Sequence, residues 1–469
     1  MNDITACFAF LRYCLGYKGD MSGMVAGMNW QELYSFASKQ ALLGLCFEGI
    51  ERLGEEYSEE LKQNPIGREL LMTWMGKAQQ IRRQNMKVNA VAGKLFSMLR
   101  EDGLRCCILK GQGNALMYPN PYSRTPGDID VWVNASRERI MEYAQKKFEL
   151  GDDIRLQHLE TSLDGVPVEL HFFPCSMNNP IYHARLQKWF RRNADLQCSH
   201  IVGLPDGAGD IAIPTTAFNV IYQLTHLYHH FFDEGIGMRQ IIDYYYVVCD
   251  FYKVYQNSSK ITPSLFFDKA SCTRQFESEL SLHSLASLFP IKEGSTSHPA
   301  PLTLRGEGGN RPTRCSEPLR SKDGGPSKVS PDCAGWDRLD TTGDTSSVSC
   351  SSASTALDVV QRELKYLGLW KFAGAVMYVL KEVLGLSEDK MIAPMDEKRG
   401  KLLLAEILNG GNFGQYFTKY GGFTHQSMGK KYFLKIWRNM HFVRYYPAEA
   451  LSEPIFRTWH FFWRMKNKK

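Results

Sequence analysis

Residues 104–133 read LRCCILKGQGNALMYPNPYSRTPGDIDVWV, and this stretch decides the fold. A short β-prone run, RCCIL (105–109), leads into a turn of small residues and a short helix, and DIDVWV (128–133) predicts a second strand. The preceding residues, from about 30 to 103, have helical periodicity, with apolar positions recurring at three and four. The chain therefore changes from helix to α/β structure near residue 104.

A β-hairpin is predicted downstream of these strands. The runs LETSL (159–163) and VPVELHFF (166–173) flank Asp164-Gly165, a dipeptide that suits a two-residue turn because both residues can adopt positive φ. Helical periodicity returns from about 215 to 255 and resumes at Leu357. We therefore expect an α+β fold with a small mixed β-sheet core flanked by N-terminal and C-terminal helical regions.

The expected organisation has five parts. About half of residues 291–356 are Ser, Thr, Pro or Gly, a composition that cannot bury enough apolar surface to offset its ordering entropy. This segment is therefore predicted to be a disordered insertion within a helical domain. The parts are an N-terminal helical region (1–103), an α/β core (104–210), a C-terminal helical region (211–290 and 357–420), the insertion (291–356) and a basic, aromatic-rich tail (421–469).

The composition is that of a folded globular protein. Of 469 residues, 43% are hydrophobic and 23% are charged, which excludes a wholly disordered chain. No run of about 18 apolar residues occurs, and the first 20 residues lack the features of a secretory signal, so we expect a cytoplasmic protein. The 12 cysteines include no C-x-x-C pair, which favours reduced thiols over a zinc site.

The positive charge is concentrated in the tail. Residues 430–469 carry ten Lys and Arg residues against Glu449 and Glu453, interleaved with aromatic residues. Such a segment could bind phosphate groups, an anionic membrane surface or nucleic acid. The alternative is a helix that packs its aromatic side chains on the domain and leaves a solvated basic face.

Three acidic residues are the candidate metal ligands. In a strand, side chains alternate between faces, so Asp128 and Asp130 project from one face, and Glu169 and His171 share one face of the later hairpin. A D-x-D triplet alone is weak evidence. If the hairpin lies beside the DID strand, however, the three carboxylates converge into an oxygen-rich site of the kind that Mg²⁺ prefers.

The turn before the D-x-D strand is a candidate phosphate site. Lys110, Gly111 and Gln112 join a strand to a short helix, which offers backbone N–H groups and a cation to phosphate, although the Walker A spacing is absent. An ordinary strand-to-helix turn is the alternative. Arg124 could form a fork to a triphosphate or be merely solvated.

The histidines are less specific. His158 and His171 could orient an acceptor or satisfy local hydrogen bonds. A zinc site in the sequence HLYHH (226–230) is disfavoured, because the spacing is not H-E-x-x-H. The i,i+4 spacing of Arg239 and Asp243 predicts a helical ion pair, although the pair could instead close over a nucleotide.

Taken together, LKG (109–111), R-x-x-GDID (124–130) and VELHF (168–172) resemble the uncharacterised nucleotidyltransferase family, which is typical of bacteria and part of the DNA polymerase β-like superfamily. The likeness covers about 25–255 and resumes near 357–417. It implies a polymerase β-like palm and transfer of a nucleoside monophosphate from an NTP, such as ATP, to an acceptor hydroxyl, with two Mg²⁺ ions and release of pyrophosphate. The acceptor could be a sugar, a small alcohol, a protein side chain or an RNA end.

The resemblance also implies residue roles. Asp128 and Asp130 would bind Mg²⁺, and Glu169 would join one ion and help deprotonate the acceptor. Gly111 and Gln112 would contact the nucleotide phosphates, with Lys110 and Arg124 neutralising their charge. The superfamily's turn is commonly Gly-Ser or Gly-Gly, and Lys110-Gly111 stands in its place here. Two rivals are a nucleotide-binding regulatory protein without turnover and a nucleic-acid or membrane-surface module that uses the tail.

Overall fold

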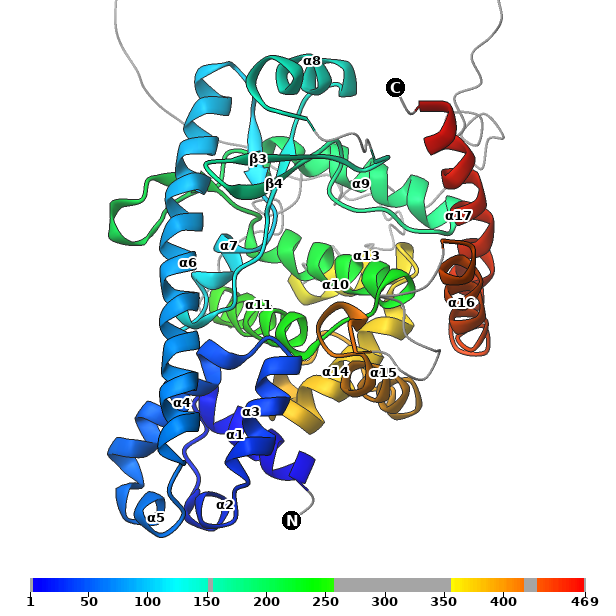
Figure 1. The fold of residues 1–469 in the computed structure, drawn as a ribbon. Coiled ribbons are helices and arrows are strands. Elements are labelled where there is room, and N and C mark those ends of the chain that lie inside the picture. The colour runs from blue at the N-terminus through cyan, green and yellow to red at the C-terminus, as the bar shows by residue number, and fades with distance from the viewer. Residues whose placement is uncertain (1–2, 151–154, 257–355, 417–427, 468–469) are drawn as a thin grey trace, which may run out of the picture. The chain divides into compact units, whose positions relative to one another are not determined.

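The computed structural model describes residues 3–150, 155–256, 356–416 and 428–467, all of which belong to one compact unit (Figure 1). The insertion predicted at 291–356 lies outside the described residues apart from Ala356, with which a helix begins. The boundaries expected between the other parts stay predictions.

The N-terminal region is helical, as its periodicity predicts. Its longest helix spans 34 residues and ends just before Gly103, whose φ of +72° belongs to the left-handed region that glycine favours. The helices are α1 (Asp3–Cys14), α2 (Ser22–Ala26), α3 (Trp30–Lys39), α4 (Leu43–Glu56), α5 (Ser58–Gln63) and α6 (Arg68–Glu101).

The α/β core follows directly. It contains the two predicted strands and the predicted hairpin, together with two longer helices and a second, two-stranded sheet that the sequence patterns did not indicate. The elements are β1 (Cys106–Ile108), α7 (Gln112–Ala115), η1 (Pro121–Ser123), β2 (Ile129–Val133), α8 (Arg137–Lys147), β3 (His158–Leu163), β4 (Val166–His171), α9 (Pro180–Gln197), β5 (Ile201–Gly203), η2 (Pro205–Gly207) and β6 (Asp210–Ala212).

The main sheet is mixed and has the order β1-β2-β4-β3. β1 pairs antiparallel with β2, β2 parallel with β4, and β4 antiparallel with β3. The β3–β4 hairpin turns at Asp164 and Gly165, whose φ values of +50° and +70° are those of the predicted tight turn. The α+β fold with a small mixed sheet and helical flanks is thereby confirmed.

The two faces of the sheet pack against different layers. One face buries residues such as Ile108, Val131 and Leu170 against the apolar side of α6. The other face carries Trp132, whose ring lies 6.1 Å from Phe190 of α9 (centroid to centroid). Because the register alternates strictly, Asp130 and Glu169 lie on this second face.

The C-terminal region is helical again, with a break at Gly235 where φ is +108°. α10 is buried along most of its length, and its buried polar side chains include Asn219, Gln223 and His226. The elements are α10 (Thr216–Asp233), α11 (Met238–Gln256), α13 (Ala356–Tyr366), α14 (Trp370–Leu384), η5 (Glu388–Lys390), α15 (Glu397–Gly410), η6 (Asn412–Gly414), α16 (Met428–Met440) and α17 (Pro447–Asn467).

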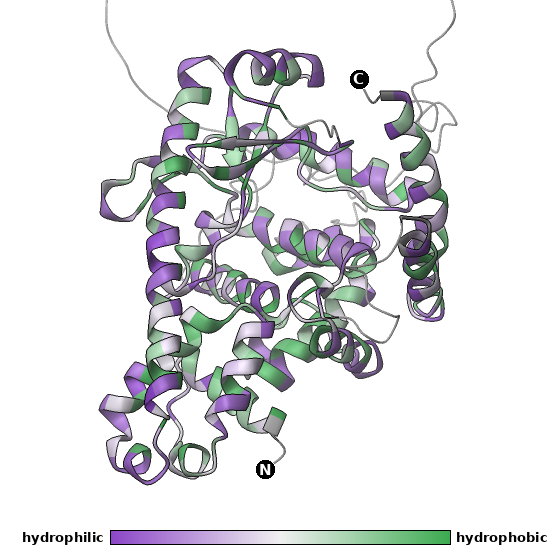
Figure 2. Cartoon of the chain, viewed as in Figure 1, coloured by the Kyte–Doolittle hydropathy of each residue, from purple (hydrophilic) through white to green (hydrophobic). Residues whose placement is uncertain are grey.

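The last two helices are anchored by charge. Asp233 at the end of α10 accepts hydrogen bonds from Lys435 Nζ at 3.0 Å and Arg457 Nη2 at 2.8 Å, while the buried Arg438 donates to the carbonyl of Phe231 at 2.8 Å. Part of the tail's basic charge therefore attaches the last two helices to α10. Figure 2 shows hydrophobic and hydrophilic residues mixed along α17.

Two further findings concern the described residues. The eight cysteines among them are all free thiols. Within the same described ranges, no helix is both long enough and apolar enough to cross a membrane.

Candidate active site

Three carboxylates converge on the second face of the sheet. The parallel pairing of β2 with β4 sets Asp130 directly beside Glu169, and Asp128 immediately precedes β2. One carboxylate oxygen from each of the three lies within 4.8 Å of the other two. Asp130 is buried, whereas Asp128 and Glu169 are half-buried. The cluster is therefore reachable from one side and enclosed on the other.

Lys110 is the cation of this cluster. It follows β1, and its Nζ lies 3.2 Å from Asp130 Oδ2 and 3.0 Å from Nε2 of His226 on α10. Burial lowers the pKa of Lys110, but the negative charges of Asp130, Asp128 and Glu169 outweigh it and raise the pKa above its usual value. The ammonium group thus stays charged and partly balances the three acids.

His171 bridges two of the acids. Its Nε2 lies 3.0 Å from Asp130 Oδ1 and 3.1 Å from Glu169 Oε2. Burial lowers the pKa of His171, but the hydrogen bonds to both carboxylates raise it to about 9. Burial raises the pKa of Asp130, yet Lys110 and His171 hold it below its usual range. Glu169 behaves differently, because burial raises its pKa despite the His171 hydrogen bond.

His158 stands opposite His171 in the β3–β4 pair, with ring centroids 5.0 Å apart. Its Nδ1 lies 3.4 Å from Glu169 Oε2 without hydrogen-bond geometry. Burial and the neighbouring charge of His171 lower the pKa of His158 to about 2, so the imidazole is neutral. Both candidate histidines therefore border the acidic cluster.

The turn after Lys110 is built on a glycine. Gly111 has φ +61° and ψ −104°, a conformation that side chains disfavour, and it precedes the four-residue helix α7. The side chain of Gln112 donates to Asn89 of α6, and Gln223 of α10 donates to Asn114 of α7 at 3.1 Å. Buried amides on both sides thus hold this turn, and the Gln112 side chain is already engaged.

Arg124 has a different position from the one expected. Its guanidinium is buried and forms two hydrogen bonds of 2.8 Å to the carboxylate of Asp243 on α11, while Asn85 of α6 donates to its carbonyl at 2.7 Å. The N–H groups of the guanidinium face a protein carboxylate instead of an open phosphate site. In this arrangement Arg124 positions the loop that leads to Asp128, because a buried bidentate pair fixes both partners.

The pairing of Asp243 corrects a second expectation. The i,i+4 spacing predicted an ion pair with Arg239, but Asp243 is engaged across the fold by Arg124. Arg239 instead donates to the carbonyl of Thr125 at 2.9 Å, and its Nε has no hydrogen-bond partner. This buried cation lies beside Gly127. The sequence pattern assigned Arg239 the wrong partner, because helical spacing offers a local partner and says nothing of a distant one.

The histidines of α10 form no metal cluster of three ligands within the described part of the chain. His226 Nε2 contacts His230 Nε2 at 3.1 Å as well as Lys110. Burial and the charge of Lys110 hold the pKa of His226 well below its usual value, so His226 accepts a hydrogen bond from Lys110. Its role here is to orient that cation.

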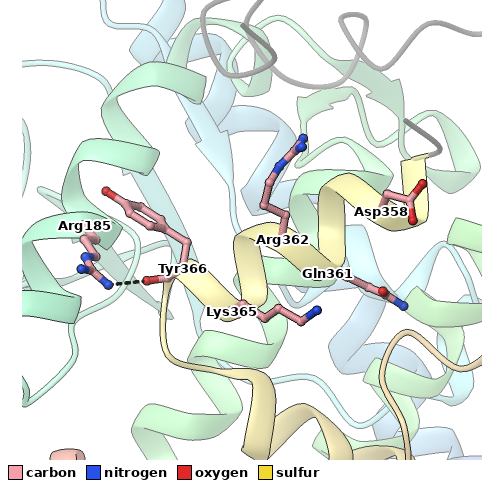
Figure 3. Close-up of a pocket in the computed structure, with 6 residues that line it drawn as sticks. All are labelled: Arg185, Asp358, Gln361, Arg362, Lys365 and Tyr366. Carbon is pink, nitrogen blue, oxygen red and sulfur yellow. Dashed lines mark hydrogen bonds between the residues drawn. The ribbon is translucent and has the colours of Figure 1, made fainter. Parts of the chain in front are cut away.

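A surface pocket of about 500 Å³ lies elsewhere, against α13 and α9 (Figure 3). Arg185 donates to the carbonyl of Tyr366 at 3.0 Å across it. None of the lining residues belongs to the acidic cluster. The candidate active site is therefore the carboxylate cluster and not this pocket.

Comparison with known families agrees with this geometry. A sequence model of the uncharacterised nucleotidyltransferase family matches residues 26–261, a span that contains β1 to β4 and every candidate site residue. The chain belongs to this family, as the motifs indicated. Searches of curated proteins and of solved structures found no match. Family membership supports a general role in the transfer of nucleoside monophosphates.

Proposed function

We propose that the protein transfers a nucleoside monophosphate from an NTP to an acceptor hydroxyl at the cluster of Asp128, Asp130 and Glu169. The observation that carries the proposal is the convergence of three carboxylates within 4.8 Å on one face of the sheet. In the reaction, the acceptor oxygen bonds to the α-phosphorus, the bond between the α-phosphorus and the α–β bridging oxygen breaks, and pyrophosphate leaves.

The residues fit Mg²⁺. The donor set consists entirely of carboxylate oxygens, which hard divalent ions prefer. We propose that Asp128 and Asp130 hold both ions of a pair and that Glu169 contributes to one. When bound, Mg²⁺ would supply charge stabilisation for the attacking and leaving oxygens.

The remaining roles belong to the chain's own groups. Burial raises the pKa of Glu169, which suits it to accept the proton of the acceptor hydroxyl. The backbone N–H groups of Gly111 and Gln112 and the ammonium of Lys110 are proposed to contact the phosphates. Arg239 is proposed as a second phosphate-facing cation in place of Arg124, because its Nε has no partner.

The test is label transfer. Purified protein is incubated with each of the four NTPs, labelled at the α-phosphate, with Mg²⁺ and a pool of small-molecule, RNA and protein acceptors. We expect one NTP to yield a labelled product with pyrophosphate, and Asp128→Asn and Asp130→Asn to lower its rate at least about 100-fold. Asp164→Asn is the matched control: it makes the same change in the exposed hairpin turn, where asparagine tolerates the positive φ.

Label transfer that survives both active-site changes would refute the proposal. Absence of transfer with every NTP, combined with nucleotide binding, would instead support the rival of a regulatory protein without turnover. Equilibrium dialysis with each NTP therefore accompanies the assay. Retention of all three carboxylates favours turnover, since a binding protein has no need of the proton acceptor Glu169.

A second candidate function is supported by the surface of the helices α16 and α17. Each presents an exposed apolar stripe at helical spacing, in which Phe433 is 64% exposed and Ile455 is 73% exposed. Glu449 and Glu453 are buried, so the exposed charges around the stripes are mainly basic. We propose that this surface binds an anionic membrane surface, because apolar stripes with basic flanks suit that partner. The stripes consist of Phe433, Trp437, Met440, Leu451, Ile455, Phe462 and Met465, and Phe461 of α17 is exposed as well.

Liposome flotation tests this candidate. We expect binding to vesicles that contain phosphatidylserine and a loss of at least about tenfold in Ile455→Ser/Phe462→Ser, since each large side chain contributes about 1.5–3 kcal/mol when fully buried. The control is Met72→Ser/Met86→Ser, which removes two exposed methionines from α6. Equal binding by both variants, or binding to RNA alone, would refute the membrane proposal. Substitutions are preferable to truncation, because truncation at 452 removes Arg457 and its ion pair with Asp233.

A further inference from the structure

A second group of potential metal ligands adjoins the acidic cluster. His158, Glu169 and His171 lie on the same face of the β3–β4 hairpin, and one ligand atom from each lies within 4.8 Å of the other two. Glu169 is common to both groups. The second group differs from the first in chemistry, because two of its three ligands are imidazoles.

His158 gives the independent sign that a ligand belongs here. The residue is only 8% exposed, and neither ring nitrogen has a hydrogen-bond partner. Its Nδ1 lies 3.4 Å from Glu169 Oε2 but outside hydrogen-bond geometry, and its Nε2 lies 3.8 Å from Glu160 Oε1, beyond hydrogen-bond range. A buried polar group without a partner destabilises the fold. A bound cation would satisfy the nitrogen that faces Glu169.

The spacing of the ligand atoms fits an ion. Ligands at about 2.1 Å from a cation are separated by about 3.0 Å in an octahedron and about 3.4 Å in a tetrahedron. The observed separations are 3.1 Å from His171 Nε2 to Glu169 Oε2 and 3.4 Å from His158 Nδ1 to the same oxygen. Both lie within this range, and binding of the ion releases the proton through which His171 Nε2 contacts Asp130 and Glu169.

We propose that His158, His171 and Glu169 form a second cation site, which binds a first-row transition-metal dication. Imidazole ligands favour such ions, from Mn²⁺ to Zn²⁺, whereas Mg²⁺ prefers an all-oxygen site. When the two histidines hold a cation, they do not also orient the acceptor, which is the role that the sequence suggested for them. It also fixes the orientation of Glu169, the carboxylate that the two sites share. The inference does not rest on nucleotidyl transfer, since the site is complete without a nucleotide.

Pulsed electron paramagnetic resonance of the tag-free full chain, loaded with Mn²⁺ in millimolar Mg²⁺ and without nucleotide, tests the site. We expect nitrogen coupling from coordinated imidazole. His158→Asn should reduce this coupling and weaken Mn²⁺ binding at least about tenfold. Asp128→Asn should leave the nitrogen coupling intact, because it changes only the acidic cluster. His441→Asn, at an exposed histidine of the tail, is the matched control.

Absence of nitrogen coupling in the wild-type chain would overturn the inference, and this measurement needs no variant that might misfold. Coupling unchanged in both His158→Asn and His171→Asn would also overturn it, as would complete displacement of Mn²⁺ by Mg²⁺. Calorimetric titration with Zn²⁺ adds a second measurement. Zn²⁺ binding that persists in millimolar Mg²⁺ supports the assignment. A chain that binds Mn²⁺ through nitrogen but transfers no nucleotide would refute the proposed function and leave this site standing.

Discussion

Replacing Asp243 by asparagine tests the pairing that holds the loop before the D-x-D strand. The Asp243 carboxylate accepts two hydrogen bonds of 2.8 Å from Arg124 and one of 2.7 Å from Tyr118. Asparagine keeps one acceptor oxygen but sets an N–H₂ group against Arg124 Nη2. The guanidinium then stays buried, loses the opposing charge and faces a donor where it had an acceptor.

The magnitude follows from burial. The Arg124 and Asp243 side chains are 4% and 7% exposed, and removal of one partner from a buried pair costs about 3–5 kcal/mol. The control is Asp164→Asn, which breaks an ion pair with Lys94 whose side chains are about half exposed, so it should cost at most about 1 kcal/mol. Burial raises the pKa of Asp243, but Arg124 holds it below its usual value. This contribution is therefore present above pH 4 and is lost as the pH falls further.

Urea denaturation of the full chain at pH 7 measures both variants. A loss below about 1 kcal/mol for Asp243→Asn, equal to that of the control, would refute the assignment of a structural pair. Arg124→Met/Asp243→Leu separates charge from position, since apolar residues of similar size can replace a buried pair at little cost. We expect this double variant to recover most of the stability lost in Asp243→Asn.

Three further predictions follow from particular residues. Gly111→Ala forces a side chain into φ +61°, which should cost about 1–3 kcal/mol and lower nucleotidyl transfer; unchanged activity and urea midpoint would contradict the role given to this turn. Burial raises the pKa of Glu449 to about 7, so the contribution of Glu449 to stability is greatest below pH 4.5 and is lost as the pH rises through 7. Glu449→Gln should flatten this part of the stability–pH curve, and parallel curves for the variant and the wild-type chain would disprove the prediction. Excision of 291–356 should leave cooperative unfolding and far-UV circular dichroism of the remaining chain intact, whereas an insoluble product would show that the segment contributes to the core.

Local patterns accounted for most of the secondary structure around the site. Helical periodicity predicted the long helix before Gly103, and Asp164-Gly165 predicted the hairpin, because both signals depend on neighbours within a few residues. The strands β5 and β6 went unpredicted. They are three residues long and flank the turn LPDGAG (204–209), so no alternating pattern stands out; β1 is as short, but the apolar run RCCIL indicated it.

The partners of the charged residues could not be predicted in the same way. Arg124 pairs with Asp243, which is 119 positions distant in the chain, and Lys110 contacts His226, 116 positions distant. Sequence spacing favours nearby partners, such as Arg239 for Asp243, and carries no information about which helices pack together. Burial decides these pairs, because a charge withdrawn from water needs a partner wherever the fold supplies one.

By itself, the sequence indicated the candidate acids, the strand that carries Asp130 and the hairpin that carries Glu169. Only the tertiary structure decided that β4 lies parallel to β2 in the register that sets Asp130 beside Glu169, and that Arg124 faces inward. The physical reason is the distance along the chain over which each interaction acts. Alternation and turn chemistry act between neighbouring residues, whereas strand order and ion pairing are selected by the burial of whole surfaces against one another.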